Sequence, residues 1–159
     1  SVVSVEIVDD PYSTIGEKIE VLRSIRDDQL AAMYSRSQID DAQYRAGRKW
    51  QQLFGISAIG AVRAIDPSRE AVDGGRMAEP ITDKQLDAFK TLGECNKILG
   101  VGGADLVRDV LGHGLSIAQA AERREYDSER EVKYVGHRFR ICLESMAIHW
   151  GFAQRKYHR

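Results

Sequence analysis

The sequence is poor in proline and cysteine and has no long apolar run. Only three prolines occur in 159 residues, so few positions prevent helix formation. The two cysteines, Cys95 and Cys142, have no cysteine or histidine partner at the spacing of a metal site, which argues against a zinc centre or a disulfide framework. No segment is apolar over the roughly 20 residues that span a bilayer, and the first residues do not resemble a signal peptide. We therefore expect free thiols in a soluble, cytoplasmic protein without a membrane partner.

A strong overall charge is also missing. The net charge is −1, which provides no global electrostatic argument for nucleic-acid binding. The distribution is uneven, because residues 1–30 hold seven acidic and three basic residues, whereas residues 120–159 hold nine basic and six acidic ones. The C-terminal part is therefore the better place to look for an anionic partner.

The apolar residues recur mostly at helical spacing, and the composition is 43% hydrophobic. This predicts a mainly α, multi-helical fold with a real core. Turn signals between residues 61 and 80, Asp-Pro and Asp-Gly-Gly, predict a linker with a small β-hairpin near residues 60–75, built from extended pieces such as 61–65 and 70–73. The predicted helices cover residues 14 to about 34–37, 39–54, 83–99, 104–111, 117–124 and 129–150.

This pattern divides the chain into four parts. Residues 1–13 alternate like a strand without a partner and are predicted to form an extended arm. Residues 14–60 form an N-terminal helical pair, a candidate for dimerisation, and can pack either on the rest of the chain or on another subunit. Residues 61–80 form the linker. Residues 81–159 form a helical domain that ends in a tri-helical helix-turn-helix over residues 104–150.

Two capping boxes indicate the helix-turn-helix. Ser116 stands three residues before Gln119, and Ser128 stands three residues before Glu131. In this arrangement a serine and a Glu or Gln each satisfy a free backbone N–H at the start of a helix. A third box, Thr82 with Gln85, predicts the start of the helix at 83.

The last predicted helix has two faces. On a helical wheel its apolar residues from Val132 to Trp150 fall within an arc of about 100°, the width of a core-facing stripe. The opposite side is rich in hydrogen-bond donors, which suits phosphates and base edges in a major groove, although charged helix faces are usually just solvated. With Ser116 at the start of the first helix, the candidate DNA-binding residues are Arg130, Lys133, Tyr134, His137, Arg138 and Arg140.

Residues 115–134, LSIAQAAERREYDSEREVKY, resemble the pattern LSxxEIAxxLxxSxxTVKxH of regulators related to sigma-factor region 4 and to LuxR-type activators. The turn is one residue longer than in that pattern, and Arg124 stands where the pattern buries a leucine. A wider set of segments, GRKWQQLF, EAVDGG, LVRDVLGHGLSIAQAA and ESMAIHWG, resembles an alphaproteobacterial and prophage domain family of unknown function that is associated with helix-turn-helix regions. This resemblance implies a bacterial or phage-derived regulator and supplies no catalytic residues.

Sequence motifs that would indicate catalysis or phosphate binding are weak. His113 lies between two glycines without an acid or a nucleophile at a diagnostic spacing, and the glycines at 100, 102 and 103 follow a predicted helix and lack the lysine of a phosphate-binding loop. We therefore predict no enzyme, no cofactor and no metal.

Two functions remain. The first is a sequence-specific, DNA-binding transcriptional regulator that binds double-stranded DNA as a dimer. The alternative is a protein-interaction module, either an adaptor to RNA polymerase or a phage assembly component such as a small terminase subunit. Ile141 lies within the basic face of the last helix and favours the alternative, because interaction surfaces use apolar anchors.

Overall fold

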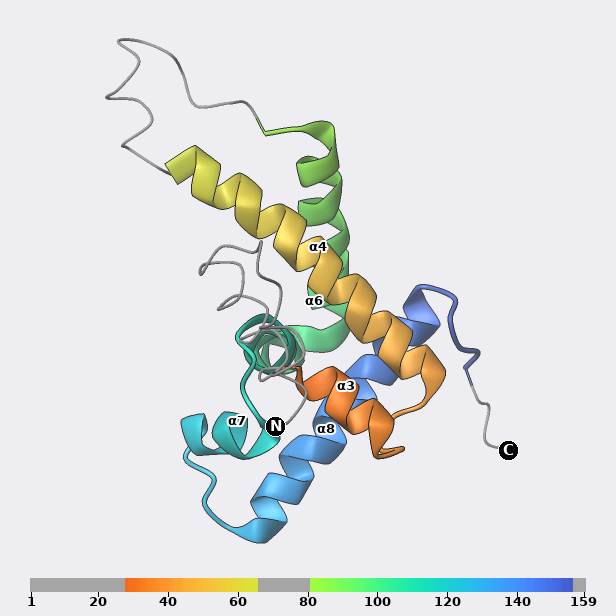
Figure 1. The fold of residues 1–159 in the computed structure, drawn as a ribbon, viewed down its shortest axis with the longest axis vertical. Coiled ribbons are helices and arrows are strands. Elements are labelled where there is room, and N and C mark those ends of the chain that lie inside the picture. The colour runs from red at the N-terminus through yellow and green to blue at the C-terminus, as the bar shows by residue number, and fades with distance from the viewer. Residues whose placement is uncertain (1–27, 66–80, 156–159) are drawn as a thin grey trace, which may run out of the picture.

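The structure, a computed structural model, describes residues 28–65 and 81–155. In these two segments the chain forms five α-helices and one π-helical turn and contains no strand (Figure 1). The prediction of a mainly α fold is confirmed. The predicted arm, residues 1–13, lies outside the described residues.

The first described helix is α3, Gln29–Ser35. Asp28 caps it, since its carboxylate accepts from the backbone N–H of Ala31 at 3.0 Å, and its own backbone is not helical, with φ −82° and ψ 73°. The predicted continuous helix from residue 14 to about 34–37 is therefore wrong at Asp28, although its end is correct. An aspartate accepting from the N–H three residues later favours a helix start over a helix interior.

Helix α4, Asp41–Ile65, is eleven residues longer than predicted at its C-terminal end, which we placed at Phe54. It begins with a reciprocal cap, in which the Asp40 carboxylate accepts from the N–H of Gln43 at 2.8 Å and the Gln43 side chain accepts from the N–H of Asp40 at 2.9 Å. Gly55 does not end it, because one glycine costs a helix only about 1 kcal/mol and α4 packs along both α6 and α8. The extended piece predicted at 61–65 is wrong, since these residues are helical; the rest of the predicted hairpin lies outside the described residues.

Helix α6, Asp83–Val107, changes direction at Gly100, whose φ of 73° is left-handed. The predicted end of a helix at Gly100 is thus correct, but the helical pattern resumes at once instead of at residue 104. The chain continues into a π-helical turn, η1, Arg108–Gly112, where the N–H of His113 donates to the carbonyl of Arg108 at 3.0 Å. The predicted Thr82–Gln85 capping box is present.

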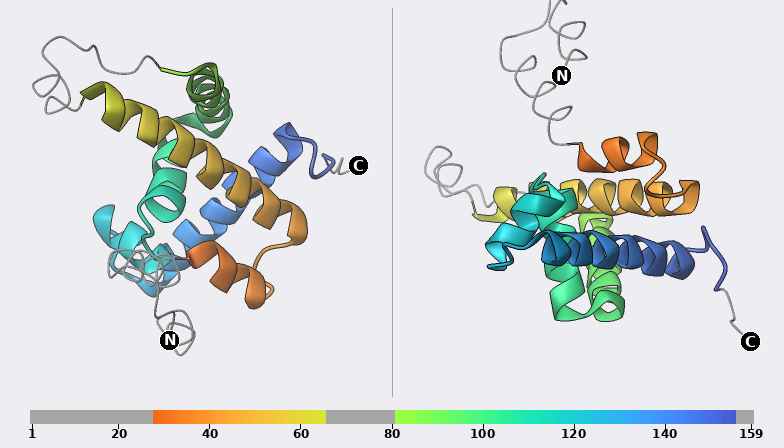
Figure 2. Two further views of the ribbon diagram at one scale, coloured as in Figure 1. Left: turned by 45° about the horizontal axis from the view of Figure 1, so that its top comes forward. Right: turned by 90° about the horizontal axis from the view of Figure 1, so that it is seen from below.

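The last two helices are α7, Ile117–Arg123, and α8, Glu129–His149. Helices α3, α4 and α8 lie in successive rows (Figure 2, right), and α8 contacts α4, α6 and α7. The apolar face predicted for α8 is buried, and Phe139 and Leu143 are completely inaccessible.

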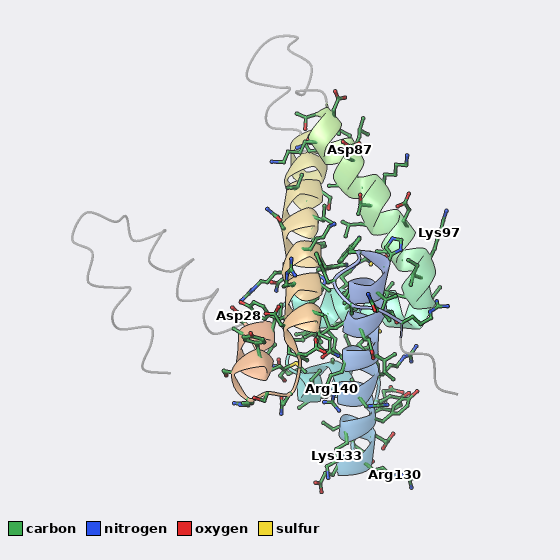
Figure 3. All side chains as sticks on the ribbon, turned by 90° about the vertical axis from the view of Figure 1, so that its right-hand side faces the viewer. Asp28, Asp87, Lys97, Arg130, Lys133 and Arg140 are labelled. Atoms are coloured by element: carbon green, nitrogen blue, oxygen red, sulfur yellow. The ribbon has the colours of Figure 1, made fainter. Side chains whose placement is uncertain are left out.

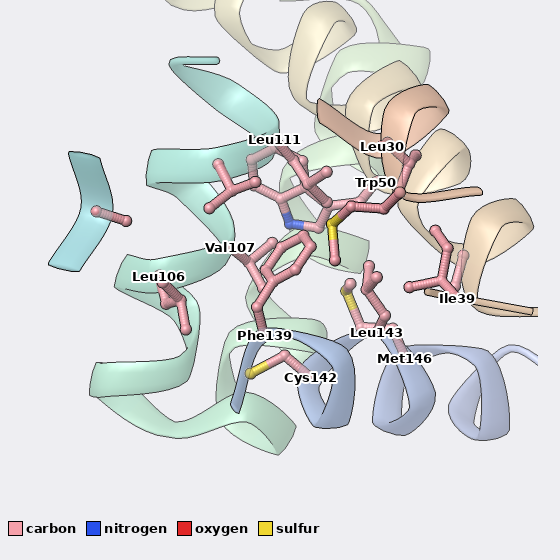
Figure 4. Close-up of a cluster of buried hydrophobic side chains, with 14 of the residues drawn as sticks. Leu30, Ile39, Trp50, Leu106, Val107, Leu111, Phe139, Cys142, Leu143 and Met146 are labelled. Atoms are coloured by element: carbon pink, nitrogen blue, oxygen red, sulfur yellow. The ribbon is translucent and has the colours of Figure 1, made fainter. Parts of the chain in front are cut away.

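One core serves both ends of the described chain (Figure 4). Leu30 of α3 and Trp50 of α4 belong to the same buried cluster as Leu106 of α6 and Phe139 of α8. Residues 28–58 therefore pack on the rest of the chain. The other buried members of this core are Met33, Ile39, Ala46, Cys95, Val107, Val110, Leu111, Ala120, Ala121, Val135, Cys142, Leu143, Met146 and Ala147.

Candidate functional site

The pair α7 and α8 begins where the sequence predicts. Ser116 Oγ accepts from the N–H of Gln119 at 3.1 Å, and the N–H of Ser116 donates to Gln119 Oε1 at 2.9 Å. Ser128 and Glu131 repeat this exchange at 3.2 and 3.3 Å. Both capping boxes are present, so the Ser116 hydroxyl is used to start α7.

A short turn joins the two helices. Arg124 ends α7, and Glu125 takes a left-handed conformation, with φ 61°. The N–H of Tyr126 then donates back to the carbonyl of Ala121 at 3.0 Å, as at many helix ends that close through a left-handed residue. Tyr126 packs against the core, which anchors the turn and sets the direction in which α8 begins.

Arg124 is held by acidic residues of the segment before α7. Its guanidinium donates to Asp109 at 2.8 Å and to Asp105 at 3.0 Å, and Asp109 also pairs with Arg123. The Asp109 side chain is completely inaccessible, and that of Arg124 is 21% exposed. An ion pair therefore stands where the LuxR-type pattern that residues 115–134 resemble has a buried leucine, and it ties η1 to α7. The sequence did not indicate it, because partners 15 residues apart on different elements leave no periodic signal.

The outward side of α8 carries four of the predicted DNA-binding residues. We call Arg130, Lys133, Tyr134 and His137 the α8 outer face; all four are exposed. Arg130 and Lys133 lie at the free tip of the helix (Figure 3). These residues are brought together as the sequence predicted.

The two remaining arginines lie at the margins of this face, next to different neighbours. Arg138 reaches α6, since a Cβ on Gly102 would lie 2.6 Å from its Nη2 atom. Arg140 is half-buried, and its guanidinium lies beside Gly136 of α8 near α7, since a Cβ on Gly136 would lie 3.5 Å from Ile117 and 3.7 Å from Arg140 Nη1. Its backbone carbonyl accepts from the Gln43 side chain of α4 at 3.0 Å. The helical wheel placed both at the flanks of the basic side, but it could not show which neighbour each flank meets.

Acidic side chains at the start of α8 moderate its positive charge. Lys133 pairs with Glu129 at 3.2 Å, with both side chains highly exposed, at 77% and 84%. Glu131 is engaged in the capping box. Carboxylates at a helix N-terminus interact favourably with the helix dipole and stabilise the helix, but they repel phosphates. If Lys133 is to bind an anion, its ion pair with Glu129 has to break first.

A second cationic surface lies along α4. Arg45, Arg48 and Lys49 of α4 line a groove of about 750 Å³ together with Lys84 of α6 and Phe152 after α8. The sequence did not join the three α4 cations to Lys84 or Phe152, because these come from distant parts of the chain.

The described residues provide little support for a metal site or for a reactive thiol. In them, no three His, Cys, Asp or Glu side chains form a group that could hold a metal ion. Cys95 and Cys142 are free and buried, and burial, with a smaller contribution from Cys142, raises the pKa of Cys95 to about 11. A neutral, buried thiol is a poor nucleophile. His113 is exposed and faces the edge of the Phe54 ring, with 6.4 Å between ring centroids.

No helix within residues 28–65 and 81–155 is long and apolar enough to cross a membrane. Comparisons of the chain with protein families, curated proteins and solved structures found no match.

Proposed function

We propose that this protein is a sequence-specific DNA-binding transcriptional regulator that uses α7 and α8 as a helix-turn-helix. One observation carries the proposal: four exposed donor side chains, the α8 outer face, stand together at the free N-terminal end of a long, capped helix. In helix-turn-helix proteins the N-terminal residues of the second helix contact base edges while the first helix crosses the backbone.

The rigid support of α8 favours the same function. The buried side of α8 is part of the core, the Tyr126 turn sets its entry, and the Asp109–Arg124 pair holds α7 beside it. A recognition helix needs this fixed geometry, because its side chains must meet base edges at hydrogen-bond distance. The resemblance to regulators related to sigma-factor region 4 and LuxR-type activators agrees with this role.

The proposed regulator is a cytoplasmic dimer without cofactor or catalytic activity. A single small module buries little surface on DNA, so two copies on half-sites about 34 Å apart provide the affinity and specificity that one lacks. The binding residues are Arg130, Lys133, Tyr134 and His137 at base edges and phosphates, with Arg138, Arg140 and Ser116 at the margins of the interface.

Salt-dependent binding tests the proposal. We expect the full chain to bind duplex DNA selected from a random pool, with an affinity that falls steeply between about 50 and 200 mM salt. Arg130→Ala and Lys133→Ala should each weaken binding by about three- to tenfold and flatten the salt slope. Lys97→Ala is the matched control, because Lys97 is exposed on α6, away from the α8 tip (Figure 3). Equal binding by all four proteins, or none, would refute the proposal.

A protein-interaction role is the second candidate. Tyr134 and Ile141 lie two helical turns apart on α8 and are 53% and 47% exposed. Such a pair can anchor a partner helix from RNA polymerase or from a phage assembly. Ile141→Ala discriminates the two functions: it should leave DNA affinity within about twofold if α8 reads DNA through its N-terminal half, and abolish complex formation if α8 docks a protein.

A further inference from the structure

We infer that the groove along α4 binds a phosphate ester, as a site separate from the α8 outer face. Among the residues that the structure describes, it is lined by four cations and by no carboxylate. Its volume, about 750 Å³, falls within the range of small-molecule sites, about 300–1,000 Å³. The remaining lining residues are Tyr44, Gln52, Leu53, Ile56 and Phe152.

Two cations of the groove, Arg45 and Lys49, lie over aromatic rings. The Arg45 guanidinium lies 4.6 Å from the centre of the Phe152 ring. Lys49 Nζ lies 4.9 Å from the Trp150 ring and 5.8 Å from the Phe152 ring. Cation–π contacts of this kind contribute about 0.5–1 kcal/mol at exposed sites. They restrict long side chains that would otherwise move freely, which lowers the entropy cost of binding an anion.

Only one of these cations has an acidic partner among the described residues. Arg48 pairs with Asp28 at 2.6 Å and also donates to Tyr44 and Gln51. In the described chain, Arg45, Lys49 and Lys84 form no ion pair. Within residues 28–65 and 81–155, three positive charges on one groove therefore have no acidic partner, an arrangement that raises the local concentration of anions.

The residues that line the groove also indicate which kind of molecule carries the phosphate. Guanidinium and ammonium groups bind phosphate oxygens strongly, and arginine does so with two parallel hydrogen bonds. Leu53, Ile56 and Phe152 add an apolar wall beside these charges, so an ester with an organic body fits better than inorganic phosphate. The ester can come from a free nucleotide or from the backbone of DNA that passes the α4 side of the molecule.

The groove and the α8 outer face are at different places. Phe152 follows the C-terminal end of α8, whereas Arg130 and Lys133 are at its N-terminal end. At about 1.5 Å per residue, the length of α8 separates them by roughly 30 Å. Variants in one place can therefore be tested without disturbing the other.

Lys84→Ala is the decisive variant. Lys84 lies in the first turn of α6, where a cation opposes the helix dipole, so its removal does not weaken the fold. We expect ADP to bind the full chain in calorimetry more tightly than inorganic phosphate does. Lys84→Ala and Lys49→Ala should weaken ADP binding by about five- to tenfold each, the loss of one charge-assisted hydrogen bond. Lys97→Ala, on the same helix but outside the groove, should change it by less than about twofold.

Measuring DNA binding with the same variants distinguishes the source of the phosphate. If Lys84→Ala weakens ADP binding and leaves the affinity for duplex DNA unchanged, the ligand is a free phosphate ester. If Lys84→Ala weakens DNA binding and ADP competes with DNA, the groove holds the DNA backbone. The inference is overturned if neither ligand binds, or if Lys84→Ala and Lys97→Ala have equal effects. Arg130→Ala separates the two proposals, since it should reduce DNA affinity and leave ADP affinity intact.

Discussion

The buried carboxylate of Asp109 accepts a hydrogen bond from Arg124 at 2.8 Å and so joins the π-helical turn to the end of α7. Asp109 is inaccessible to solvent, and Arg124 is mostly covered. A buried carboxylate is costly unless it is paired and hydrogen-bonded. This pair therefore determines where α7 lies against the rest of the protein.

Removal of one partner of the Asp109–Arg124 pair should lower the stability of the protein. Asp109→Ala removes the buried acceptor of Arg124, which keeps its bond to Asp105, and we expect a loss of about 1–3 kcal/mol in the free energy of unfolding, measured with urea. The double variant Asp109→Leu with Arg124→Leu should recover most of this loss, because apolar replacements of a buried pair are often neutral. Asp87→Asn, on the surface of α6, should change stability by less than about 0.5 kcal/mol. Equal stabilities of the single and double variants would contradict this account.

Two glycines of α4 should respond to alanine with opposite signs. A Cβ at Gly47 would lie 2.6 Å from a methyl carbon of Leu30, which is itself completely buried, so Gly47→Ala should destabilise the protein by about 1–3 kcal/mol. A Cβ at Gly55 meets no atom within 4 Å, so Gly55→Ala should stabilise it by about 0.5–1 kcal/mol through helix propensity. Thermal unfolding of the two variants checks this. A stabilised Gly47→Ala protein would show that α3 does not pack closely on α4.

Stability should fall at high pH because of Cys95. Burial raises the pKa of this thiol from 9.0 to about 11, so above pH 9 the unfolded state releases a proton that the folded state keeps. The stability linked to Cys95 is complete below the unfolded pKa and is lost as the pH rises from 9.0 toward about 11. Cys95→Ala should lower stability at neutral pH but flatten this fall by up to about 1.4 kcal/mol per pH unit. Parallel curves for the two proteins would show that Cys95 does not titrate in this window.

Glu129→Gln should strengthen DNA binding if α8 enters the major groove. The substitution frees Lys133 from its partner at 3.2 Å and removes a negative charge that faces the phosphates. We expect affinity to rise about two- to fivefold at low salt and the gain to shrink at high salt. Stability should decrease by about 0.3–1 kcal/mol, because an acid is lost from the first turn of α8. Glu144→Gln, near the other end of α8, is the control and should leave affinity unchanged.

Local signals predicted the starts of α6, α7 and α8 and the ends of several helices, but they missed the start of α3, which the Asp28 side chain caps. The boxes at Thr82, Ser116 and Ser128 each involve residues three apart, so the sequence contains both partners. Gly100 marked a real break for the same reason, since its left-handed φ is a property of one residue. The apolar face of α8 was predicted from the helical spacing of its apolar residues alone.

Signals that depend on distant neighbours were missed. The helix predicted to end at Phe54 continues for eleven more residues, to Ile65, because α4 packs on α6 and α8. The Asp109–Arg124 pair and the meeting of Lys49, Lys84 and Phe152 at one groove involve separate elements. No spacing in the sequence indicates such contacts.

The sequence by itself determined the helical class, the capped starts of α6, α7 and α8, and the division of α8 into a buried and a donor-rich side, because these follow from hydrogen bonds and periodicities within a few residues. Only the tertiary structure decided that α3 and α4 share one core with α8, that Arg138 reaches α6, and that the cations of α4 border a groove. These outcomes depend on how helices far apart in sequence pack, and packing is chosen by the complementarity of whole surfaces.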